Sequence, residues 1–242
     1  MPYRSTLSLL GAAFALEFAI LAIAPVSRGV WLAENLLVFA LAAALLSSYR
    51  RFRFSRVSYT LMFVFLGLHQ IGAHYTYSLV PYDAWTRNAF GFSLDEMLGL
   101  ERNHYDRFVH FAYGLLMAYP IREVFLRIVD VRGFWGYFLP LDLTMSSSMV
   151  FELVEWVVAD VFGGSLGHEY LGAQGDVWDA HKDMALASLG AIVAMATTLS
   201  FNRAWQRDFA AEWADSFRVK QRTPLGENAV ARMLSGTSDD GA

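Results

Sequence analysis

The chain has 242 residues, of which 55% are hydrophobic and only 17% are charged, and its formal net charge is -4. Soluble domains carry about 25% charged residues, so this composition favours one membrane domain over soluble domains. The negative balance provides no broad basic surface and argues against nucleic acid as a partner. Because the chain has no cysteine, disulfides, thiolate metal sites and cysteine nucleophiles are excluded.

Long apolar stretches dominate residues 1–201. A helix needs about 20 mostly apolar residues to cross about 30 Å of hydrocarbon, where its backbone groups have to be satisfied internally. The sequence therefore predicts an all-α fold, a polytopic membrane helix bundle with about six transmembrane helices, formed by the domain 1–201. The stretches are residues 5–26, 30–48, 57–80, 103–125, 134–158 and 176–201.

The first stretch resembles a signal peptide in two respects. Arg4 precedes it, and the small residues Ala22 and Ala24 resemble a cleavage site. However, Pro25 would follow the cut, and the run is long enough to span a membrane. We therefore expect this stretch to be retained as the first transmembrane helix.

The distribution of arginine between the connections predicts the orientation in the membrane, because positively charged connections stay cytoplasmic. Arginines gather after the second, fourth and sixth stretches, whereas the connections 81–102 and 160–175 are richer in Asp, Glu, Gly and His. We predict a multi-pass protein of the inner (plasma) membrane with both termini in the cytoplasm. The arginines concerned are Arg50, Arg51, Arg53, Arg56, Arg122, Arg127, Arg132, Arg203 and Arg207.

The remaining residues, 202–242, are predicted to form a cytoplasmic amphipathic helix and a disordered tail. Aromatic residues recur every four positions at Trp205, Phe209, Trp213 and Phe217, which makes one slowly drifting stripe on a helix. Such a helix can lie on the inner leaflet or pack against a neighbouring helix, and both alternatives stay open. The last residues are small and polar, which is typical of disorder.

Ionisable residues inside membrane segments are costly, so each is a candidate functional residue. Residues four apart or three apart share a helix face, and positions i, i+3 and i+7 fall within an arc of about 60 degrees. The sequence shows all three spacings in the last three stretches. They are Asp106 and His110, Glu152 and Glu155, and Asp176, Asp179 and Asp183.

Two histidines of the third stretch cannot both point at one centre. His69 and His74 are five residues apart, which is about 140 degrees on an unbroken helix. We favour His74 as the inner residue and regard His69 as more remote or as a hydrogen-bonded interior histidine. Asp176 and Asp179 also have an ordinary alternative, because acids at a helix N-terminus favour its dipole.

The direction in which each segment crosses the membrane brings these groups to a similar depth. With cytoplasmic termini, the third and fifth stretches run outward and the fourth and sixth run inward, so all the groups reach the outer half of the membrane. Clustered carboxylates with imidazoles need a strong counter-charge in a low dielectric, and this donor set suits a divalent ion such as Zn, Mn or Fe. We therefore predict an outward-facing metal site of His74, Asp106, His110, Glu152, Glu155, Asp176, Asp179 and Asp183.

Four strings that contain these residues resemble the bacterial inner-membrane YjdF family, a domain of unknown function. They are residues 69–77, 103–111, 152–156 and 174–184, in this order, and the resemblance extends over residues 5–200. A more distant similarity, carried by Asp106 to Phe111, is to VanZ-like membrane proteins. The resemblance implies a membrane helix bundle with its site in these strings, and it implies no established reaction.

The leading functional hypothesis is metal-dependent chemistry on a lipid or envelope substrate by a hydrolase or lipid-modifying enzyme. The alternatives are a transporter or channel for a cation or proton and a non-catalytic envelope-assembly protein. A transport pathway needs polar residues that continue inward, and only Glu17, Asp142, Arg122 and Glu123 are available there. This distribution favours a site open to one side.

Overall fold

The structure is a computed structural model that describes residues 3–162, 174–220, 226, 230 and 234. These residues contain helices and connections, and no strand occurs among them. The elements are α1 Tyr3–Leu21, α2 Arg28–Ser48, α3 Arg56–His74, α4 Tyr82–Phe90, α5 Leu94–Leu98, α6 Tyr105–Val124, the π-helix η1 Phe125–Val129, α7 Trp135–Phe162, α9 Asp179–Trp205 and α10 Phe209–Asp215.

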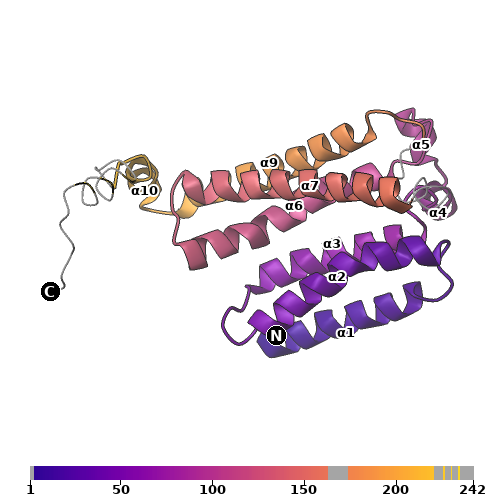
Figure 1. Ribbon diagram of the computed structural model, residues 1–242, viewed down its shortest axis with the longest axis horizontal. Helices are drawn as coiled ribbons and strands as arrows, with labels where there is room; N and C mark the ends of the chain where they lie inside the picture. Colours follow the sequence, from indigo (N-terminus) through magenta and orange to yellow (C-terminus); the bar gives the residue numbers. More distant parts are fainter. Residues whose placement is uncertain (1–2, 163–173, 221–225, 227–229, 231–233, 235–242) are drawn as a thin grey trace.

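Six long helices lie alongside one another, and they correspond to the six predicted stretches (Figure 1). Helices α1, α2 and α3 form one group, and α6, α7 and α9 form the other, with α3 and α6 in contact between the groups. The short helices α4 and α5 lie at one end, and η1 and α10 lie at the opposite end. The predicted all-α membrane helix bundle is confirmed.

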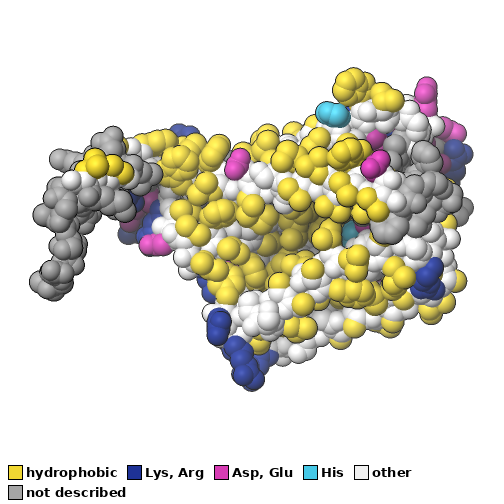
Figure 2. Space-filling model, in the orientation of Figure 1, with side chains coloured by type: hydrophobic (Ala, Val, Ile, Leu, Met, Phe, Trp, Pro, Cys, Tyr) yellow, Lys and Arg dark blue, Asp and Glu magenta, His cyan; other side chains and the backbone are white. Residues whose placement is uncertain are grey.

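Three of these helices are long and apolar enough to cross a membrane by composition alone, among the residues described: α1, α2 and α9. Helices α3, α6 and α7 have 19, 20 and 28 residues, which is enough length for about 30 Å of hydrocarbon. Their polar residues lower their hydropathy. Apolar side chains cover much of the visible outer surface (Figure 2).

The closest helix pair is α6 and α9, and two glycines make the approach possible. A Cβ added to Gly114 would lie 2.7 Å from the backbone nitrogen of Ala191 and closer still to the carbonyl oxygen of Ala187. A Cβ on Gly190 would lie 2.7 Å from the nitrogen of Leu115. Small residues are the usual means of close helix packing in membranes, and this contact aligns the first turns of both helices.

Helices α4 and α5 are joined through the carboxylate of Asp83. It accepts hydrogen bonds from Arg87 Nε at 2.8 Å, from Ser93 Oγ at 2.7 Å and from the Asp95 N–H at 3.1 Å. The Arg87 guanidinium, the Ser93 hydroxyl and the Asp95 N–H lower the pKa of Asp83 to about 2. Above that pH this carboxylate holds the connection together at one end of the bundle.

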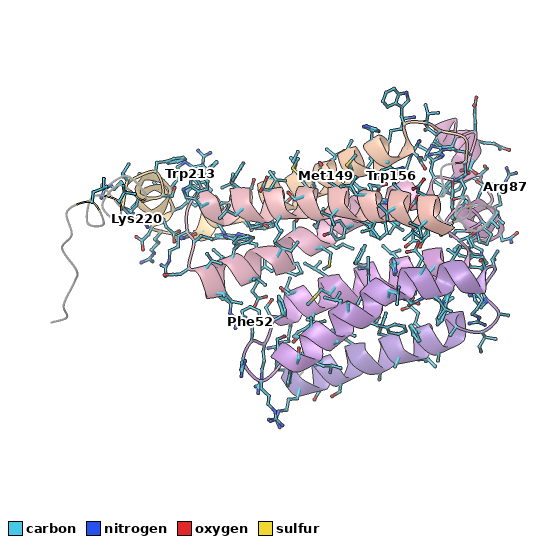
Figure 3. All side chains as sticks on the ribbon, viewed as in Figure 1. Phe52, Arg87, Met149, Trp156, Trp213 and Lys220 are labelled. Carbon is cyan, nitrogen blue, oxygen red and sulfur yellow. The ribbon has the colours of Figure 1, made fainter. Side chains whose placement is uncertain are left out.

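Two of the four C-terminal aromatic residues pack on the bundle core, whereas Trp205 and Phe217 are mostly exposed. Helix α9 continues beyond the predicted boundary at residue 201, and Phe209 and Trp213 of α10 contact the core around Tyr137. Trp135 Nε1 donates a 2.8 Å hydrogen bond to the Ser216 carbonyl, and Trp213 lies beside the beginning of α7 (Figure 3). This packing corresponds to one of the two alternatives predicted for the segment. The predicted disordered tail, at residues 235–242, lies outside the described part.

Candidate functional site

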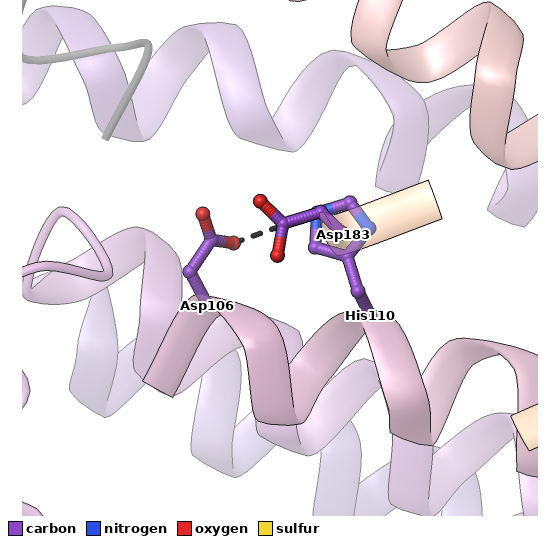
Figure 4. A group of neighbouring side chains, drawn as sticks. All are labelled: Asp106, His110 and Asp183. Carbon is purple, nitrogen blue, oxygen red and sulfur yellow. Dashed lines mark ion pairs between the residues drawn. The ribbon is translucent and has the colours of Figure 1, made fainter. Parts of the chain in front are cut away.

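Two carboxylates and one imidazole meet where α6 and α9 begin. One ligand atom from each of Asp106, His110 and Asp183 lies within 4.8 Å of the other two. Asp106 and His110 are one turn apart on α6, and Asp183 faces them from the second turn of α9 (Figure 4). The close packing at Gly114 and Gly190 brings these two helix faces together.

Further acids surround this group. His110 Nε2 lies 3.6 Å from Asp106 Oδ1 and 3.4 Å from Glu152 Oε1 of α7. Glu155, one turn further along α7, lines the same cavity as Asp106 and His110. Glu34 of α2 is buried, and its carbonyl oxygen contacts His69, which lines that cavity too. The structure therefore brings together five of the eight predicted metal ligands, with Glu34 nearby.

Several of these carboxylates are buried with an oxygen that has no hydrogen-bond partner among the described residues. The oxygens are Oε2 of Glu34, Oε1 of Glu152 and Oδ1 of Asp183. These residues are only 2%, 8% and 2% exposed. A buried carboxylate without compensation is strongly unfavourable, so the cluster needs a bound cation or protons.

Asp176 and Asp179 belong to a separate ion-pair network. Asp176 Oδ2 accepts from Arg107 Nη2 at 2.5 Å and from Lys182 Nζ at 2.6 Å. Asp179 forms ion pairs with Arg102 and Arg107, the latter at 3.3 Å. Three side-chain cations thus neutralise two carboxylates at the edge of the site, and these two predicted ligands have partners other than a metal.

His74 is not part of the three-residue group. Its Nδ1 lies 2.8 Å from the Leu21 carbonyl oxygen, and its own carbonyl accepts from the Val26 N–H at 2.9 Å. The residue ties the end of α3 to the connection between α1 and α2. The preference for His74 as the inner histidine of α3 is therefore not supported by the geometry.

His69 is the α3 histidine that approaches the cluster. The Tyr77 hydroxyl donates to His69 Nδ1 at 2.5 Å, and His69 Nε2–H then donates to the Glu34 carbonyl oxygen at 3.3 Å. Both rings line the same cavity as Asp106 and His110. The pair joins α2 to the end of α3 and lines the cavity beside Asp106 and His110 of α6.

Glu34 and Tyr77 are absent from the predicted site. Glu34 lies within the apolar stretch 30–48, so the criterion used for the other acids could have found it. Tyr77 gave no such signal, because its position depends on two successive residues with positive φ, Thr76 and Tyr77, both at 54°. It also depends on Gly72, where any side chain would collide with the Tyr77 ring.

A cavity of about 540 Å³ extends from the cluster between the two helix groups. His69, Tyr77, Asp106, His110 and Glu155 line one end of it. The rest of the lining comes from α2, α3, α6 and α7 and is mostly apolar. The remaining lining residues are Leu37, Val38, Leu41, Phe65, Leu66, Val109, Tyr113, Met117, Leu143, Ser146, Ser147, Ser148, Val150, Phe151 and Val154.

Comparison with known proteins identifies the family. Residues 6–204 match the family described as "Predicted membrane protein (DUF2238)". The chain belongs to this family of membrane proteins. A curated relative, "Inner membrane protein YjdF" of Escherichia coli (strain K12), is 37% identical over 163 residues, which is 67% of this chain and 74% of the relative. No solved structure matches. These findings confirm the resemblance to the YjdF family and identify an integral membrane protein, but they assign no reaction.

Proposed function

We propose that the protein is a metal-dependent membrane enzyme that acts on a lipid or envelope substrate. The observation that supports this proposal is the convergence of Asp106, His110 and Asp183 within 4.8 Å. Glu152 is the fourth candidate ligand, because its Oε1 lies 3.4 Å from His110 Nε2 and accepts no hydrogen bond from the described residues. Carboxylate oxygens with one imidazole nitrogen suit Zn, Mn or Fe better than Mg or Ca, which prefer sites made of oxygen ligands alone.

The chemistry of such a site follows from general properties of bound metals. A divalent ion lowers the pKa of a bound water to about 7 and polarises an ester or phosphoryl oxygen. Glu155 lines the cavity together with Asp106 and His110, so it is the carboxylate best located to serve as a general base. His69 and Tyr77 supply a second proton-transfer pair on the opposite wall.

A multi-pass arrangement with both termini in the cytoplasm makes the site outward-facing. This orientation is supported by Arg50 and Arg51, which lie at the connection between α2 and α3, at the opposite end of the bundle from α4. A chelator that cannot cross the membrane should then remove the metal from right-side-out vesicles. Removal only from inside-out vesicles would contradict this orientation.

Transport of a cation or proton is the rival function, and the cavity argues against it. Away from the cluster, the described lining contains Met117, Leu143 and Val150, and its polar residues there, Tyr113 and Ser146 to Ser148, carry no carboxylate, imidazole or amine. Of the acids nearer the other end, Glu123 is bound by Ser58 and Arg127. A charged pathway needs polar groups that continue through the membrane. A non-catalytic role in envelope assembly is the third hypothesis, and it predicts no bound metal.

Metal analysis of the detergent-purified protein tests the proposal. The wild-type protein should contain a stoichiometric divalent metal, and Asp183→Asn should lose most of it. Asp130→Asn is the matched control, because Asp130 is an exposed aspartate at the other end of the bundle and should leave the metal content unchanged. Wild-type protein that contains only traces of metal and keeps its melting temperature in chelator would refute the proposal.

A further inference from the structure

We propose that the cavity binds one hydrocarbon chain of a membrane lipid whose head group lies at Asp106 and His110. The substrate would then be an acyl lipid of the leaflet at the α4 end, and not a soluble envelope component. The inference rests on the proposed function and specifies its substrate class. It is carried by the lining, the length and the lateral opening of the cavity.

The lining separates a polar end from an apolar body. The polar end is the one already described, formed by His69, Tyr77, Asp106, His110 and Glu155. Further along, the lining is formed by apolar side chains such as Leu41, Met117 and Leu143. Apolar cavities are poorly hydrated, so a hydrocarbon chain is a better occupant than water. In the body, Tyr113 Oη and Ser147 Oγ lie 2.6 Å apart and pair with each other, whereas the buried Ser148 Oγ has no hydrogen-bond partner among the described residues. The lining of the body is otherwise mostly apolar, which favours a hydrocarbon occupant over a polar ligand.

The length of the cavity corresponds to one leaflet. Asp106 and Met117 line it from the same helix and are eleven residues apart, which is about 16 Å at 1.5 Å per residue. Half of a hydrocarbon core is about 15 Å thick. A chain that begins at the acidic cluster thus ends near the middle of the bilayer, as the chain of a lipid in that leaflet does.

The cavity opens sideways to the bilayer. Leu37 of α2 and Val150 of α7 both line it, yet they are 52% and 53% exposed on the molecular surface. The space-filling view shows the corresponding hollow between the two helix groups, bordered by apolar side chains (Figure 2). The surface there is the one that faces lipid, so a chain can enter without leaving hydrocarbon.

The experiment uses a phospholipid with a photoactivatable diazirine in its acyl chain, in vesicles that contain the full-length protein. Photolabelling should concentrate on residues that line the cavity, as read by mass spectrometry. Val150→Trp should lower that labelling at least fivefold by filling the opening. Val157→Trp is the matched control, because Val157 is also on α7 and 49% exposed but does not line the cavity.

Metal content is measured on the same samples, so that the two proposals fail separately. This inference would be overturned if Val150→Trp left labelling of the cavity unchanged, or if labelling of the wild type were spread evenly over all lipid-facing helices. Neither outcome would affect the proposed metal site. Concentrated labelling in a protein without metal would overturn only the enzymatic proposal. If Val150→Trp does not fold, Leu37→Trp repeats the test from α2, with the half-exposed Leu32→Trp as its control.

Discussion

Substitution of Gly114 by alanine should disassemble the candidate metal site without touching a ligand. The new Cβ would lie 2.7 Å from the Ala191 nitrogen, whereas ordinary van der Waals contact begins near 3.4 Å. Helices α6 and α9 therefore have to separate by at least about 0.7 Å, because both atoms belong to backbone that cannot rotate away. Functional constellations tolerate displacements of about 0.5 Å.

The expected magnitudes follow from this displacement. Overpacking of a tight interface costs about 1–3 kcal/mol, and loss of ligand support lowers metal affinity by about 10- to 100-fold. Both effects can be measured on purified Gly114→Ala, by thermal unfolding in detergent and by competition with a fluorescent chelator. Helix α1 offers the control, Gly11→Ala, since nothing lies within 4 Å of its Cβ position. Wild-type metal affinity in Gly114→Ala would refute the argument that this helix contact aligns the ligands.

Three further predictions concern other parts of the bundle. Tyr77→Phe removes the hydroxyl that donates to His69, so it should destabilise the protein by about 1–3 kcal/mol, and an unchanged denaturation midpoint would contradict this. Asp83 has its pKa lowered to about 2 from an unfolded value of about 4, so its stabilisation of α4 and α5 is complete above pH 4 and is lost as the pH falls through 2. Hydrogen exchange in α4 of the wild type should become faster as the pH falls through this range, whereas in Asp83→Asn it should be fast already at neutral pH. The same pH dependence in both proteins would contradict this prediction. A topology reporter inserted at Arg51 should report cytoplasm and one within residues 81–102 the exterior, and opposite signals would reverse the proposed orientation.

The long apolar runs were sufficient to predict an all-α membrane helix bundle, because few other structures require runs of that length. It could not predict α4 and α5, whose lengths depend on local capping. Ser93 accepts a hydrogen bond from the Glu96 N–H at the start of α5, and Gly91 and Gly99 end the two helices in the left-handed conformation. Such short helices carry too little hydrophobic periodicity to be recognised.

The candidate site was predicted in part. The four-residue spacing of Asp106 and His110 is a property of one helix and could be read directly from the sequence. The pairing of Asp179 with Arg102 could not, because it depends on where the connection before α6 lies relative to α9. The angular separation of His69 and His74 shows only that they cannot share one centre, and the predicted depth placed His74 near the outer end of its segment. The choice between them depends on the contacts of α3 with α1 and α2.

The metal itself is the central claim, and X-ray absorption spectroscopy at the metal edge tests it most directly. The proposed ligands predict a first shell of oxygen atoms and one imidazole nitrogen, at about 2.0–2.2 Å if the metal is zinc. His110→Asn should remove the imidazole contribution, whereas His181→Asn, which changes a histidine of α9 outside the three-residue group, should leave the spectrum unchanged. An all-oxygen shell, or an imidazole signal that survives His110→Asn, would contradict the assignment of the site.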